Sequence, residues 1–134
     1  MLGSNKNSGF TIIELLIVVV IMGLLMSLVA PTMFSKVDST KISTAKAQMQ
    51  MLQTALDTHM LDLGKYPDEL DALRESTGRG WDGPYIPKSV PLDPWGNRYQ
   101  YRQEGQDGAA FLLFSFGKDG QLGGENDAAD IIHL

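Results

Sequence analysis

Residues 10–30 read FTIIELLIVVVIMGLLMSLVA, and this stretch dictates how the rest of the chain can be arranged. Its clearly polar members are Thr11, Glu14 and Ser27, and every other position is apolar or glycine. As a helix with a rise of about 1.5 Å per residue it is roughly 31 Å long, which matches the hydrocarbon thickness of a bilayer. The stretch therefore predicts a transmembrane helix.

Two simpler explanations of this stretch leave features unexplained. A secretory signal has a shorter apolar region, of about 7 to 15 residues, with small residues before its cleavage site. Cleavage after Ala30 would place Leu28 where a small residue is needed. A plain membrane anchor does not explain Glu14, because an acidic side chain costs about 2.5 to 3.5 kcal/mol near the bilayer centre, though less towards its edge.

Glu14 therefore needs either a route to water or a partner. One alternative is that its side chain simply reaches back to the membrane interface. The other is a positive charge created nearby, which proteolysis after Gly9 would supply by turning Phe10 into a free amino terminus. A glycine before the bond suits a protease, because the chain must be threaded as an extended strand without a side chain in the way.

Residues 8–16 read SGFTIIELL and closely resemble the cleavage motif of type IV prepilins. The resemblance implies that residues 1–9 are a leader peptide, that a prepilin peptidase cuts after Gly9, and that the enzyme methylates the new terminus at Phe10. It also implies that Glu14 pairs with the terminal amine of a neighbouring subunit during assembly. A cytoplasmic N terminus before cleavage rests on the resemblance alone, because the basic residues favour neither orientation clearly.

The apolar stretch is followed at once by Pro31, which removes a backbone donor and costs about 3 kcal/mol in a regular helix. We expect a kink or local melting there, as in pilin-like proteins; the alternative is that one helix ends and another begins. Residues 31–64 then carry apolar side chains at alternating steps of three and four, which predicts an amphipathic helix ending near Gly64. These side chains are Ile42, Ala45, Met49, Leu52, Leu56, Met60 and Leu63.

Residues 65–134 predict a small domain that covers the apolar stripe of this helix. A short helix is expected over residues 68–74, directly after Pro67. Alternating or apolar patterns of strand length occur at 98–102, 110–116 and 131–134. The expected fold class is α+β, with a long N-terminal α-helix, transmembrane and then amphipathic, packed on a small antiparallel β-sheet of about three strands, as in pilins.

Charge and composition exclude several functions. The formal net charge is −5, and because Lys6 and Glu14 cancel, the deficit lies in residues 31–134, so no nucleic-acid partner is expected. Cysteine is absent, which excludes disulfides and thiolate metal sites. The histidines, His59 and His133, accompany no nucleophile motif, so we expect them to be ordinary surface or packing residues and the chain not to be an enzyme.

Four more motifs follow in order: LGKYP at 63–67, WDGPY at 81–85, DPWGNRYQY at 93–101 and SFGKDG at 115–120. With the prepilin-like motif, they resemble the major pseudopilin family of the type II secretion system. The resemblance implies a subunit of the bacterial inner membrane, with a periplasmic C-terminal domain, that polymerises into a helical pseudopilus driving protein export. The partners it implies are further copies of the chain, minor pseudopilins, prepilin peptidase and the inner-membrane assembly platform. A subunit of an adhesive or motility type IV pilus is the alternative.

Residues 107–134 hold five carboxylates against one lysine, together with several glycines. Oxygen donors in a flexible loop suit Ca²⁺, but the spacing is not that of an EF-hand, and a solvated acidic turn stays open as the alternative. The pseudopilin resemblance implies that this loop binds Ca²⁺. The ligands that it implies are the carboxylates of Asp119 and Asp127, the side-chain oxygen of Asn126, and the carbonyl oxygens of Phe116 and Gln121. The part played by Asp130 is left open.

Overall fold

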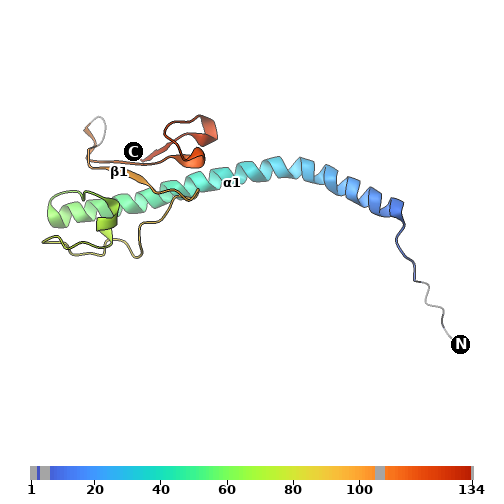
Figure 1. The fold of residues 1–134 in the computed structure, drawn as a ribbon, viewed down its shortest axis with the longest axis horizontal. Helices are drawn as coiled ribbons and strands as arrows, with labels where there is room; N and C mark the ends of the chain where they lie inside the picture. The colour runs from blue at the N-terminus through green and yellow to red at the C-terminus, as the bar shows by residue number, and fades with distance from the viewer. Residues whose placement is uncertain (1–2, 4–6, 105–107, 134) are drawn as a thin grey trace. The chain divides into compact units, whose positions relative to one another are not determined.

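The computed structural model describes residue 3, residues 7–104 and residues 108–133, with the side chain of Asp127 excepted. The chain divides into two units, Met1–Val37 and Asp38–Leu134. One α-helix, α1 (Ile12–Leu63), contributes to both units and is coloured from blue to green in Figure 1. The remaining elements all belong to the second unit.

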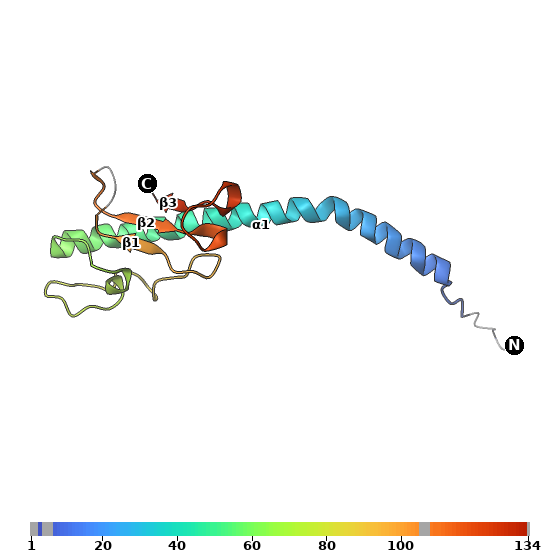
Figure 2. The same ribbon diagram turned by 45° about the horizontal axis from the view of Figure 1, so that its top comes forward.

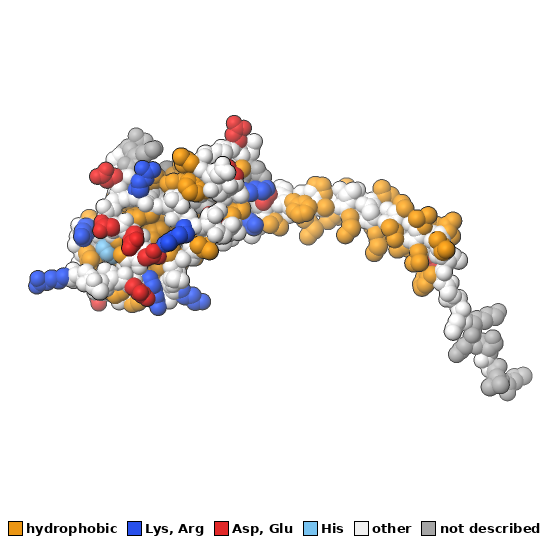
Figure 3. All heavy atoms as spheres, viewed as in Figure 1, with side chains coloured by type: hydrophobic (Ala, Val, Ile, Leu, Met, Phe, Trp, Pro, Cys, Tyr) orange, Lys and Arg blue, Asp and Glu red, His pale blue; other side chains and the backbone are white. Residues whose placement is uncertain are grey.

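The part of α1 in the first unit exposes an apolar surface. Every large apolar side chain between Ile12 and Val37 is exposed, and Figure 3 shows many of them in orange along the helix. A soluble monomer rarely leaves a contiguous apolar surface of this extent in water. By length and composition α1 is the one helix in the described part of the chain that can cross a membrane, which agrees with the predicted transmembrane helix.

The helix continues through Pro31 without interruption. The local melting that the proline led us to expect is not present, and the alternative of a helix end at this point is wrong. Proline removes a single donor, the one that would serve the carbonyl of Ser27, so the adjoining turns can keep their own hydrogen bonds. The hydroxyl of Thr32 supports the neighbouring turn by donating to the carbonyl oxygen of Val29 over 2.7 Å.

In the second unit, α1 buries one stripe of side chains. Its buried members are Ala45, Met49, Leu52, Ala55, Leu56 and His59. The expected stripe is confirmed up to Leu56, but Met60 is 37% exposed and His59 is buried in its place. The His59 ring packs edge-on against Tyr85 and its Nδ1 lies 2.9 Å from the carbonyl oxygen of Lys65, so the imidazole is satisfied inside the domain.

Three short strands form the sheet, as the sequence predicts. They are β1 (Gln100–Arg102), β2 (Leu112–Ser115) and β3 (Ile131–His133). The sheet is antiparallel with the order β1-β2-β3, and Figure 2 shows the three strands beside the C-terminal part of α1. Leu113 and Ile131 of the sheet share a core cluster with Met49 and Leu52 of the helix.

The segment between α1 and the sheet is mostly irregular. Its short helix is the 3₁₀ helix η1 (Leu70–Leu73), shorter than the expected 68–74. Leu70 and Leu73 are buried, so two side chains anchor this turn to the core. A single 3₁₀ turn suffices for that purpose, and such helices are usually short because their hydrogen-bond geometry is poorer than that of an α-helix.

Candidate functional site

The predicted cleavage site lies in an exposed, irregular segment before α1. Residues 7–11 adopt no regular secondary structure, and Phe10 is 80% exposed. A Cβ atom built on Gly9 would meet no heavy atom within 4 Å. The bond between Gly9 and Phe10 is therefore not protected by secondary structure, as a protease that binds an extended chain requires.

The start of α1 shows a role for Glu14 that we did not predict. The backbone N–H of Glu14 donates to Thr11 Oγ1 over 3.2 Å, and the N–H of Thr11 donates to Glu14 Oε2 over 3.4 Å. This reciprocal pair is a capping box, in which two otherwise unpaired helix donors are satisfied. It explains why the helix begins at Ile12 rather than Phe10. The Thr-x-x-Glu pattern was the sequence signal that could have revealed it.

The acidic loop, residues 116–130 between β2 and β3, contains two single-turn helices. These are η3 (Gly117–Asp119) and η4 (Asn126–Ala128). Phe116 is the residue before η3, and Asp119 ends it. Asp119 Oδ1 accepts from the backbone N–H of Gln121 over 3.1 Å, and Asn126 begins η4 with a positive φ of 55°. Four of the five predicted metal ligands thus lie at the ends of these turns or beside them.

Glycines let the two sides of this loop approach closely. A Cβ atom on Gly117, whose φ is 76°, would lie 2.7 Å from the carbonyl oxygen of Ala129. A Cβ on Gly124, whose φ is 100°, would collide with the carbonyl oxygen of Ala128 and lie 2.8 Å from Asp119 Oδ2. The Asp119 carboxylate therefore faces the backbone of the opposite side of the loop.

The donors in this loop fit a hard cation in their chemistry. Asp130 Oδ2 accepts from the N–H of Gly123 over 2.9 Å, while Asp130 Oδ1 is buried without a hydrogen-bond partner among the described residues. A buried carboxylate oxygen of this kind calls for a proton donor or a cation. No cluster of three His, Asp or Glu side chains that could hold a metal occurs among the residues that the structure describes. The side chain of Asp127 lies outside that set, so the predicted ligand set stays a prediction.

An ion pair attaches the acidic loop to the helix. Lys118 Nζ lies 3.0 Å from Asp38 Oδ2, and both side chains are partly exposed. Because these residues are 80 positions apart, no local pattern in the sequence could have indicated the pair. A partly exposed pair of this kind contributes little to stability, on the order of 0 to 1 kcal/mol.

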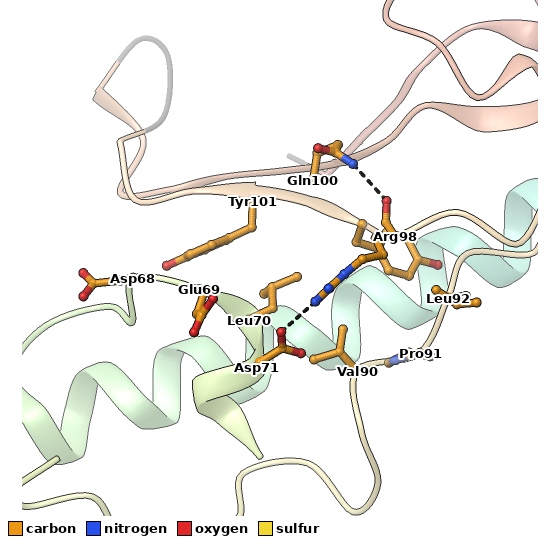
Figure 4. Close-up of a pocket in the computed structure, with 11 residues that line it drawn as sticks. Asp68, Glu69, Leu70, Asp71, Val90, Pro91, Leu92, Arg98, Gln100 and Tyr101 are labelled. Carbon is orange, nitrogen blue, oxygen red and sulfur yellow. Dashed lines mark hydrogen bonds and ion pairs between the residues drawn. The ribbon is translucent and has the colours of Figure 1, made fainter. Parts of the chain in front are cut away.

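A separate cleft of about 520 Å³ lies between η1 and β1. Figure 4 shows Arg98 reaching across it to Asp71, over 2.6 Å. Tyr101 donates its hydroxyl proton to the carbonyl oxygen of Pro67 over 2.7 Å, and burial, followed by the nearby Tyr66 and Asp68, raises the pKa of Tyr101 to about 12. The lining holds no histidine and no nucleophile beside a base, so it offers no catalytic arrangement.

The two histidines are also structural. His59 contacts Tyr85 and Lys65 as described above, and His133 Nε2 is hydrogen-bonded to Gln53 Oε1. His59 is buried and His133 is partly buried, which agrees with the expectation that they are ordinary surface or packing residues.

Comparison with known proteins covers nearly the whole chain. The family model described as "Type II secretion system (T2SS), protein G" matches residues 32–134, and the model of the prokaryotic N-terminal methylation motif matches residues 4–30. A type II secretion system core protein G from Pseudomonas aeruginosa is 42% identical over 95% of this chain and 94% of its own length. The core protein G of Vibrio cholerae is 40% identical over 95% of this chain and 91% of its own length.

A solved structure has the same fold. The crystal structure of the major pseudopilin from the type 2 secretion system of enterohaemorrhagic Escherichia coli superimposes with a TM-score of 0.61 at 30% identity. The match covers 73% of this chain and 86% of the crystallised one. The long helix and the three-stranded antiparallel sheet are the features that the two chains share.

Proposed function

Because this chain belongs to the type II secretion system protein G family, we propose that it is the major structural subunit of a pseudopilus and not an enzyme. The observation that carries the proposal is the pair of adjoining matches, the methylation motif over residues 4–30 and the protein G model over residues 32–134. The relatives are named for secretion, so a subunit of an adhesive or motility pilus is not favoured.

Maturation begins with cleavage by a prepilin peptidase after Gly9 and methylation of the new amino terminus at Phe10. Support comes from the methylation-motif match and from the exposed, irregular chain around this bond. Cleavage removes residues 1–9 and leaves a positive charge four residues before Glu14.

Assembly then covers the apolar surface of α1. In the single chain, all large apolar side chains between Ile12 and Val37 are exposed, so they need either lipid or other helices around them. Helices of neighbouring copies provide that cover through close packing. Glu14 pairs with the amino terminus at Phe10 of a neighbour, which offsets the cost of a carboxylate in hydrocarbon. The uninterrupted helix at Pro31 is the state before assembly, and this proline lets the helix bend or melt within the fibre.

The proposed location follows from the anchor. The helix holds the subunit in the bacterial inner membrane, with the N terminus cytoplasmic before cleavage and the second unit in the periplasm. Partners are further copies of the chain in a helical homopolymer, minor pseudopilins and the inner-membrane assembly platform. Addition of subunits at the membrane extends the fibre and pushes the exported protein outwards.

The acidic loop is the proposed Ca²⁺ site. Asp119 and Asp127 would supply carboxylates, Asn126 a side-chain oxygen, and Phe116 and Gln121 carbonyl oxygens; Asp130, whose Oδ1 has no described partner, is a further candidate. Ca²⁺ bound here would neutralise the crowded carboxylates and tie η3 to η4. Such a link would crosslink the loop as a disulfide would, and this cysteine-free chain cannot form a disulfide.

The assembly proposal is tested by substituting Glu14 in cells that carry the secretion system. Glu14→Ala removes both the charge and the capping contact with Thr11, whereas Glu14→Gln keeps a capping acceptor and removes only the charge. We expect both variants to lose fibre, measured by crosslinking of subunits, whereas the control Glu75→Ala on the second unit assembles normally. Full assembly of Glu14→Gln would show that helix capping, and not charge pairing, is what assembly needs from this residue.

A further inference from the structure

Asp93 has a buried carboxylate group, and the sequence analysis predicted no role for it. It is 4% exposed and lies in the turn formed by residues 93–97. Its Oδ1 accepts from the backbone N–H groups of Trp95, over 3.0 Å, and Asn97, over 2.8 Å. Its Oδ2 accepts from the hydroxyl of Ser115 over 2.6 Å. Three donors compensate for the loss of water around this charge, so the group is a fixed anchor point inside the domain.

Ser115 connects this anchor to the acidic loop. It is the last residue of β2, and its side chain is fully buried. While it donates to Asp93, its Oγ accepts from the backbone N–H of Gly117 over 3.1 Å. Gly117 is the first residue of η3, the turn that ends at Asp119. A path of two hydrogen bonds therefore runs from the Asp93 carboxylate to the start of this turn.

Asn97 meets the other end of the same turn. Its backbone is held by Asp93, since the Asn97 N–H donates to the carboxylate and the Asn97 carbonyl accepts from the Asp93 N–H over 2.8 Å. A Cβ atom on Gly120, the residue after η3, would lie 3.1 Å from Asn97 Nδ2. The turn of residues 93–97 thus contacts η3 at its start, through Ser115, and at its end, through Asn97.

We infer that Asp93, Ser115 and Asn97 are positioning residues for cation binding by the acidic loop. They do not contact the cation; they hold η3 in place so that Asp119 and the carbonyl oxygen of Phe116 are already arranged as ligands. This inference rests on the proposed Ca²⁺ site. Arranging ligands before binding removes part of the ordering cost of binding, so loss of the link lowers affinity even though every ligand remains.

The test is calorimetric titration of CaCl₂ into the full chain in detergent micelles, for the wild type and for Ser115→Ala. Removing the hydroxyl leaves Gly117 N–H without its acceptor and cuts the path from Asp93. We expect the Kd for Ca²⁺ to rise by about tenfold or more, the usual effect of losing a partner in the outer shell of a metal site. Leu73→Ala is the matched control, because Leu73 is also fully buried but lies in η1. It should lower Tm without changing the Kd.

A second variant keeps the test decisive if Ser115→Ala does not fold. Asn97→Ala removes only the amide that packs against Gly120 and leaves the backbone contacts of Asp93 in place, and it too should raise the Kd. If the wild type binds Ca²⁺ and the folded variants bind it equally well, the positioning role is wrong while the calcium site stands. If the wild type gives no binding heat and no change in Tm with CaCl₂, the site itself is wrong and the inference fails with it.

Discussion

Single residues in the acidic loop show how closely its backbone is packed. Gly123 and Gly124 both have positive φ values, 89° and 100°, which side chains other than glycine rarely adopt. Their surroundings differ: a Cβ on Gly123 meets nothing within 4 Å, whereas one on Gly124 collides with the carbonyl oxygen of Ala128. This pair separates the cost of backbone strain from the cost of a steric clash.

We therefore predict that Gly124→Ala destabilises the second unit more than Gly123→Ala does. Backbone strain alone costs about 1 to 3 kcal/mol and applies to both variants. The clash adds to it only at Gly124. The measurement is urea unfolding of the chain in detergent micelles, followed by circular dichroism, and equal losses in the two variants would contradict the close approach of the loop's two sides.

Tyr101 gives the domain a sensitivity to alkaline pH. Its pKa is raised from 10.0 to about 12, mainly by burial, so the folded state holds the phenol proton more tightly than the unfolded chain does. The stabilising effect is complete below pH 10 and is lost as the pH rises to about 12. We predict that Tyr101→Phe makes the fall in unfolding free energy over this range shallower, measured by denaturant unfolding at several pH values. An unchanged slope would show that other groups cause the alkaline loss.

At the level of elements, much of the architecture was predictable because hydrophobic periodicity is strong here. The apolar stretch, the stripe through Leu56 and the three strands all follow from it. The burial of His59 where Met60 was expected was not predictable. The Tyr85 ring and the Lys65 carbonyl, which contact the His59 ring, come from distant or irregular segments. The same reason applies to the ion pair between Lys118 and Asp38.

The buried stripe packs the second half of α1 against the domain, and its contribution to the unfolding free energy can be measured. Leu52 is fully buried, whereas Leu61 on the same helix is 84% exposed. We predict that Leu52→Ala lowers the unfolding free energy by about 2 to 5 kcal/mol, because it removes core contacts and leaves a cavity. Leu61→Ala should change it by less than about 0.5 kcal/mol. Similar losses for the two variants, in urea titrations of the chain in micelles, would show that the stripe is assigned wrongly.

The capping box at the start of α1 could have been predicted from the sequence. It was missed because Glu14 was interpreted through ion pairing. Thr11 and Glu14 have the spacing of the motif, and the described chain forms both of its hydrogen bonds. One carboxylate therefore serves the helix end before assembly and, as proposed, a neighbour's amine afterwards. Local sequence shows the first role, whereas the second depends on another molecule and cannot be read from one chain.

For the whole molecule, the division into two units separates two tasks. The first unit exposes apolar surface that only lipid or other helices can cover, and the second holds the core and the acidic loop. The calcium ligands are proposed from a family resemblance, because their spacing is not that of an EF-hand. Four of them lie at or beside the turns η3 and η4, which no sequence pattern predicted. The structure adds most to what the sequence showed at Asp130, because the Oδ1 atom of this residue is buried without a hydrogen-bond partner among the described residues.

We predict that Ca²⁺ raises the Tm of the chain and that Asp119→Ala abolishes the increase. A ligand that binds only the folded state stabilises it in proportion to the logarithm of its concentration. The measurement is a thermal melt in micelles with CaCl₂ and again with a chelator, and Glu75→Ala serves as the control for loss of an exposed carboxylate. Melting curves that do not change on chelation would remove the site.

The whole chain works as proposed only if it is shortened before it assembles. The decisive measurement is the intact mass and amino-terminal sequence of the protein purified from the membranes of its native host. We expect a chain that lacks residues 1–9 and begins at a methylated Phe10. A chain that keeps those nine residues, or that begins with an unmodified residue elsewhere, would contradict the proposal that this is a processed pseudopilin.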